Sequence, residues 1–137
     1  MSTLERAIAL AAEAHAGMVD KAGAPYILHP LRVMLRVDGE RARIAAVLHD
    51  VVEDTDWTIE RLREEGFDPE VLAAVDALTR REGEDYYDFC RRAARHPIAR
   101  VVKRADIEDN LDLSRIPDPT PADHARVERY RRALELL

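Results

Sequence analysis

The stretch from residue 46 to residue 54, AVLHDVVED, constrains this chain most strongly because it sets ionisable side chains within an apolar helical pattern. Apolar residues recur through it at helical spacing and require burial. Its polar residues all carry acid/base or metal-ligand chemistry: His49, Asp50, Glu53 and Asp54. On one continuous helix, His49 and Glu53 lie one turn apart. Asp50 and Asp54 lie one turn apart on the adjacent face. Carboxylates beside a buried face are costly unless a partner such as a divalent cation neutralises them. An amphipathic helix with an acidic polar face is the simpler alternative.

Length and composition set limits on the kind of protein. The 137 residues are interpreted as a single domain over 1–137, long enough for one core. A formal net charge of −6 argues against nucleic acid polymers and anionic membranes as partners. We recognise neither a signal peptide nor an apolar run long enough to span a membrane. The one cysteine, Cys90, excludes an internal disulfide and is expected to pack inside the protein. These features predict a cytoplasmic protein and leave its oligomeric state open.

Start and stop signals predict an all-α fold of about seven or eight helices. Ser2-Thr3-Leu4-Glu5 reads as a capping box, and Gly39 separates two helices. His29-Pro30 places proline at the first position of a helix, which sets His29 at the helix mouth. No segment alternates with the period of a β-strand. The predicted helices run approximately over 2–16, 30–38, 40–53, 58–65, 69–80, 84–95, 97–112 and 121–137.

The helix predicted near the end of the chain, over 97–112, carries a second polar set. Asp106 and Asn110 lie one turn apart, with Lys103 and Asp109 beside them. An aspartate inside a helix is unfavourable by propensity, so either a salt bridge to a nearby arginine or a metal must explain it. The candidate metal ligands of the whole chain are two imidazoles and two carboxylates: His29, His49, Asp50 and Asp106. This mixture suits Mn²⁺, Fe²⁺ or Zn²⁺ better than Ca²⁺ or Mg²⁺.

These residues resemble a known family. The chain is similar to the HD-domain phosphohydrolases, and more closely to the (p)ppGpp hydrolase domain of Rel/SpoT-type enzymes and of small alarmone hydrolases. The resemblance rests on the order and spacing of several short stretches along most of the chain: Ala14-His15-Ala16-Gly17, residues 23–30, residues 48–55, Leu78-Thr79-Arg80, and residues 102–106 with Asn110.

The resemblance implies an all-α HD domain that holds one Mn²⁺ through His29, His49, Asp50 and Asp106. In such hydrolases a metal-bound water attacks phosphorus and releases pyrophosphate from the 3′ position of a nucleotide. By the same resemblance, Glu53 and Asp54 orient or deprotonate that water. The implied substrate-contacting residues are Lys21, Tyr26, Lys103 and Asn110, with Asn110 at the nucleotide sugar and Tyr26 shaping its loop. His15 is not a matched ligand and is expected to support the site or pack in the core.

Two positions depart from the family pattern. Asp20 stands where the family usually has arginine, and Asp109 stands where it usually has histidine. Each would repel a polyphosphate if it faced the substrate. Two alternatives therefore remain beside an alarmone hydrolase. One is a hydrolase of another phosphoester such as a nucleoside monophosphate, and the other is a catalytically silent module that binds metal or nucleotide. The intact Glu53-Asp54 pair argues against the silent module.

Overall fold

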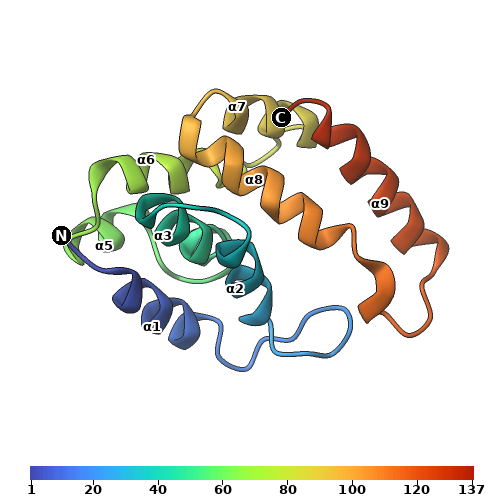
Figure 1. Ribbon diagram of the computed structural model, residues 1–137, viewed down its shortest axis with the longest axis horizontal. Helices are drawn as coiled ribbons and strands as arrows, with labels where there is room; N and C mark the ends of the chain where they lie inside the picture. Colours follow the sequence, from blue (N-terminus) through green and yellow to red (C-terminus); the bar gives the residue numbers. More distant parts are fainter.

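The computed structural model describes all residues from 1 to 137 and confirms the all-α prediction (Figure 1). The only β-type pairing is an isolated bridge between Val19 and Pro25. None of the helices combines the length and apolar composition needed to cross a bilayer. The helices are α1 (Leu4–Ala14), α2 (Leu28–Leu35), α3 (Glu40–Leu48), α4 (Val51–Asp54), α5 (Ile59–Glu64), α6 (Pro69–Ala77), α7 (Tyr86–Ala94), α8 (Pro97–Asn110) and α9 (Pro121–Leu134), with a 3₁₀ turn at Leu113–Arg115.

Helix α3 lies at the centre of the main core. It contacts α1, α2, α6 and α8, and these helices surround it in Figure 1. Every residue from Ile44 to Leu48 is buried. Alanines at positions 45 and 46 let neighbouring backbones approach closely, while the larger side chains fill the space between helices. A smaller cluster around Cys90 and Ile107 joins α7, α8 and the C-terminal segment, as expected for a cysteine that packs rather than reacts.

The predicted helix over 40–53 is wrong in one respect, because it is two helices. Helix α3 ends at Leu48 and α4 begins at Val51, with His49 and Asp50 in the turn between them. In a continuous helix, successive side chains point about 100° apart. The break instead brings His49 Nε2 within 3.1 Å of Asp50 Oδ2. Neither glycine nor proline marks this break, so the hydrophobic period could not show it.

Two predicted helix starts also differ from the structure. Helix α2 begins at Leu28, which places His29 inside the first turn rather than at the helix mouth. Pro30 is still tolerated there because amide groups of the first turn have no partner within the helix. At the N-terminus, Thr3 rather than Ser2 caps α1 by accepting a hydrogen bond from Arg6 N at 3.1 Å. Ser2 does not cap the helix, and its hydroxyl instead donates to the carbonyl of Glu65 at 2.7 Å.

We expect Leu10→Ala to lower the free energy of unfolding by about 2–5 kcal/mol, because Leu10 is fully buried and its loss leaves a cavity between helices. Leu35→Ala is the matched control, since Leu35 is 72% exposed. It should change stability by no more than about 0.5 kcal/mol. Urea denaturation followed by circular dichroism measures both values, and equal effects of the two substitutions would contradict this description of the core.

Candidate functional site

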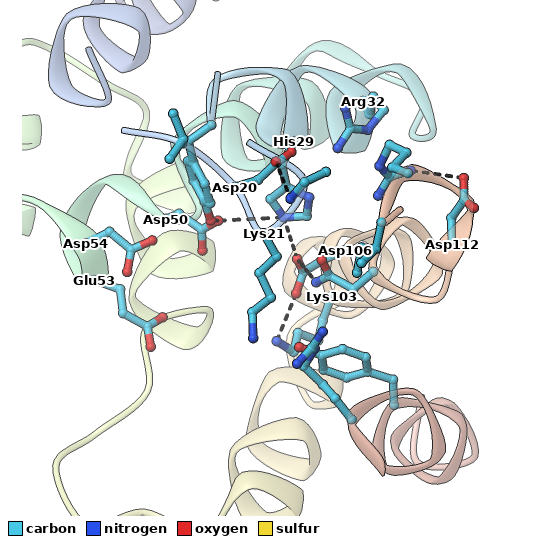
Figure 2. Close-up of a pocket in the computed structure, with 18 of the residues that line it drawn as sticks. Asp20, Lys21, His29, Arg32, Asp50, Glu53, Asp54, Lys103, Asp106 and Asp112 are labelled. Carbon is cyan, nitrogen blue, oxygen red and sulfur yellow. Dashed lines mark hydrogen bonds and ion pairs between the residues drawn. The ribbon is translucent and has the colours of Figure 1, made fainter. Parts of the chain in front are cut away.

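The structure brings together all four predicted metal ligands, which come from three parts of the chain. His29 comes from α2, His49 and Asp50 from the α3–α4 turn, and Asp106 from α8. Ligand atoms of His29, His49 and Asp50 all lie within 4.8 Å of one another. Asp106 Oδ1 lies 2.8 Å from His29 Nε2 (Figure 2). The same oxygen lies 3.3 Å from His49 Nε2. We call these four residues the His/Asp cluster.

Both imidazoles have one nitrogen occupied and the other aimed at the cluster. The Nδ1 of His29 donates to Asp109 Oδ2 at 2.7 Å, and the Nδ1 of His49 donates to the carbonyl of Ala46 at 2.5 Å. Each Nε2 therefore faces the cluster carboxylates. This is the arrangement of metal-binding histidines, whose second nitrogen is usually fixed by a carboxylate or a backbone carbonyl. The donor set and its orientation fit a divalent cation.

Without a cation, protons on the imidazoles balance the carboxylates. Burial alone would lower the pKa of His29, but hydrogen bonds to Asp106 and Asp109 outweigh it and raise that pKa to about 9. Burial alone would raise the pKa of Asp50, but the charge and hydrogen bond of His49 lower it to about 2. A buried cluster of this kind needs positive charge in its centre, which either protons or a metal ion can supply.

Asp109 does not line the cavity that adjoins the His/Asp cluster. Its carboxylate is fully buried behind His29, and Arg32 Nε donates to its Oδ1 at 2.8 Å. A guanidinium nitrogen of Arg115 lies 3.6 Å from Asp109 Oδ2. Repulsion of a polyphosphate was expected only if Asp109 faced the substrate, and in the structure it does not face the cavity. The sequence contained a signal that we did not use, because Asp109 lies three residues after Asp106 on the same helix and so can reach the same histidine.

Asp20 does line the cavity, but its carboxylate also has a structural role. Its Oδ1 accepts hydrogen bonds from the backbone amides of Ala22 at 2.9 Å and Ala24 at 3.0 Å. An aspartate that bonds the backbone a few residues ahead fixes a turn. This turn holds the loop that carries Lys21, and Figure 2 shows the Lys21 side chain extending across the cavity.

Tyr26 contacts the cluster directly and does more than shape its loop. Its hydroxyl donates to Asp50 Oδ2 at 2.5 Å. Burial and the Asp50 charge raise the pKa of Tyr26, so the phenol remains a hydrogen-bond donor. Behind it lies His15, a buried side chain whose ring centre is 5.0 Å from that of Tyr26. His15 lies outside the His/Asp cluster, in agreement with its expected supporting or packing role.

Two of the predicted substrate contacts hold Asp106 in this structure. Lys103 Nζ lies 3.0 Å from Asp106 Oδ2, and Asn110 Nδ2 donates to Asp106 Oδ1 at 3.2 Å. Lys103 is buried and also lies 4.6 Å from the centre of the Phe89 ring. Both residues line the cavity as well, so each lies between the cluster and the space that a substrate would fill.

Glu53 and Asp54 lie on the opposite wall of the cavity, on α4 (Figure 2). Desolvation at the cavity wall and the nearby charge of Asp50 raise the pKa of Asp54 to about 6. The same two causes raise the pKa of Glu53. Carboxylates with raised pKa values, beside a cluster that can hold a metal, are suited to accept and return protons near neutral pH. The cavity has a volume of about 510 Å³, which is within the range of small-molecule sites.

A sequence model of the HD domain matches residues 7–134. The chain belongs to the HD-domain family. It is 34% identical over its full length to a probable GTP pyrophosphokinase of Mycobacterium leprae, of which it covers 18%. It is 35% identical, over 79% of its length, to a guanosine-3′,5′-bis(diphosphate) 3′-pyrophosphohydrolase of Aquifex aeolicus, of which it covers 17%. The HD domain thus spans less than a fifth of these curated relatives.

A solved structure has the same fold. It is described as a metazoan ortholog of SpoT that hydrolyses ppGpp, and it matches with a TM-score of 0.80 and 27% sequence identity. The match covers 98% of this chain and 84% of that one. The HD domain is therefore related to ppGpp hydrolase domains, and its cluster of histidine and aspartate side chains is consistent with a divalent metal site.

We expect Asp109→Asn to weaken Mn²⁺ binding by about 10–100-fold, because it removes the carboxylate that orients His29 and increases its basicity. Glu108→Gln is the control, since this neighbour is exposed and pairs only with Arg104. Isothermal titration calorimetry measures both affinities. Unchanged binding in Asp109→Asn, with the fold intact by circular dichroism, would show that His29 does not need this support.

Proposed function

We propose that the chain is a metal-dependent phosphohydrolase that releases pyrophosphate from the 3′ position of guanosine 3′,5′-bis(diphosphate) or a closely similar nucleotide. The observation that carries the proposal is the pair of imidazole Nε2 atoms aimed at two carboxylates, opposite two carboxylates with raised pKa values. The relatedness to ppGpp hydrolase domains supports the choice of substrate.

We further propose that His29, His49, Asp50 and Asp106 hold the cation, with Mn²⁺ preferred for mixed imidazole and carboxylate ligands. When bound, such a cation polarises phosphoryl oxygens and makes water a better nucleophile at neutral pH. Lys103 and Asn110 fix the orientation of Asp106 through their contacts with its two oxygens. Tyr26 does the same for Asp50.

Asp54 is the proposed base, with Glu53 beside it orienting the water. The water oxygen bonds to phosphorus while the bond from phosphorus to the ribose 3′ oxygen breaks. Asp54 accepts the proton of the water, and a proton returns to the 3′ oxygen as pyrophosphate leaves. A pKa of about 6 leaves Asp54 largely ionised at neutral pH and still able to take up a proton. Lys21, exposed at the cavity mouth, and Asn110 are placed to contact the nucleotide.

A less charged phosphoester, such as a nucleoside monophosphate, is the second candidate substrate. It is favoured by Asp20 and Asp112, whose carboxylates line the same cavity. A silent binding module is the third possibility. Turnover distinguishes the three, because the first releases pyrophosphate, the second releases phosphate, and the third releases neither.

We expect Asp54→Asn to reduce the turnover of guanosine 3′,5′-bis(diphosphate) by about 10²–10⁴-fold, because the base is lost while the cluster residues remain. Glu53→Gln should reduce it as well. Glu60→Gln, an exposed change on α5, is the control and should leave turnover unchanged. Pyrophosphate release is measured with Mn²⁺ and with excess chelator, beside a nucleoside monophosphate.

Chelator should abolish the reaction of the wild type. Phosphate release from the monophosphate alone would replace the proposed substrate and retain the mechanism. Full activity of Asp54→Asn would remove Asp54 from the role of base.

A further inference from the structure

A second concave surface adjoins the main cavity and is strongly basic. We call it the rim groove, and its cations are Lys21, Arg126, Arg129 and Arg132. Glu128 is the one acidic residue in its lining. Lys21 and Arg126 also line the main cavity, so the two spaces share a wall. This basic character is local, because the whole chain has a formal net charge of −6.

The sequence of α9 builds one side of the groove. Two overlapping series, 122–126–129 and 125–129–132, have spacings of three or four residues, which places all five positions along one face of the helix. The first two are alanines, whose small side chains leave room for a hollow. The last three are arginines, which extend the basic face along the helix. The loop that carries Lys21 supplies the opposite side.

Most of these cations have no partner within the protein. Lys21, Arg129 and Arg132 form no ion pair with any carboxylate, whereas Arg126 pairs with Asp123. Elsewhere on the surface, many arginines are paired, including Arg131 of the same helix with Glu128. Unpaired cations that share one small hollow repel one another, and a ligand with several negative charges would relieve that repulsion.

Arg129 is held at the boundary between the two spaces. Its guanidinium carbon lies 5.2 Å from the centre of the Tyr86 ring and 5.8 Å from that of Tyr130. Both tyrosines line the main cavity, while Arg129 itself lines the rim groove. A cation over aromatic rings is partly immobilised, and its N–H groups remain free to bind an anion.

We propose that the rim groove binds the distal phosphates of the nucleotide whose reacting phosphate lies at the His/Asp cluster. The inference rests on the proposed function, and it assigns the groove to the end of the substrate that does not react. Lys21 and Arg126 lie between the two ends. Arg129 and Arg132 supply the outer contacts, through planar guanidinium groups that suit phosphate oxygens.

The first test compares two substrates in the double variant Arg129→Gln/Arg132→Gln. With guanosine 3′,5′-bis(diphosphate) we expect KM to rise about tenfold or more with kcat within about twofold, because both contacts bind the unreactive end. With guanosine 3′-diphosphate, which lacks the 5′ phosphates, KM should not change. The control is Arg61→Gln/Arg95→Gln, which removes the same charge from exposed positions outside both cavities. Equal KM changes with both substrates would overturn the proposal.

The second test needs no turnover, so it separates the rim groove from the proposed reaction. Inorganic tripolyphosphate is titrated into the chelator-treated protein at low salt by calorimetry. Wild type and the control variant should bind it, and Arg129→Gln/Arg132→Gln should bind it at least about fivefold more weakly, since two charge-assisted contacts are lost. Equal binding by all three proteins would overturn the proposal.

If binding of tripolyphosphate falls while both KM values stay constant, the groove binds a free phosphate ligand instead of the substrate. That result would also overturn the assignment to the distal phosphates.

Discussion

The contact on which the rest of the site depends is the buried His29 side chain held between two aspartates. Its Nε2 meets Asp106 at 2.8 Å and its Nδ1 meets Asp109 at 2.7 Å, so one imidazole joins α2 to α8. Buried charges are costly when a partner is removed. Each aspartate also has a second cation beside it, Arg32 at Asp109 and Lys103 at Asp106. The same pairs therefore fix the packing of two helices and the direction in which His29 Nε2 points.

The break between α3 and α4 is the second requirement of the site. Helix α3 is buried on nearly all sides and cannot itself present polar groups to a cavity. Ending it at Leu48 turns His49 and Asp50 toward His29 and Asp106, while α4 carries Glu53 and Asp54 to the facing wall. One short stretch thus supplies two of the four candidate ligands together with the candidate base.

Local sequence signals predicted most of the helices because those signals act locally. Asp68, His96 and Thr120 cap α6, α8 and α9 through their own side chains, and each stands directly before a proline. The break at His49 and Asp50 was missed because it is set by contacts with α2 and α8, which are distant in sequence. Ser2 was assigned to the wrong contact for the same reason, since its partner is Glu65.

The residue types predicted which side chains form the candidate site. They did not predict which other residues lie around those side chains. The orientation of Asp109 toward His29 and Arg32 depends on how α8 lies against α2. The free arginines of α9 became distinctive only when their position beside the main cavity was known. A helix face rich in arginine otherwise reads as an ordinary solvated surface.

The most direct measurement is calorimetric titration of Mn²⁺ into the metal-free protein, in two buffers of different ionisation enthalpy and from pH 6.5 to 8.5. Because the pKa of His29 is raised to about 9, its Nε2 carries a proton in most molecules across this range, and a cation must displace that proton. We predict one Mn²⁺ per chain, the release of about one proton or more for each ion bound, and an affinity that rises about tenfold per pH unit for each proton released. Absence of saturable binding, or binding without proton release, would contradict a cluster in which protons and a metal ion compete for the same place.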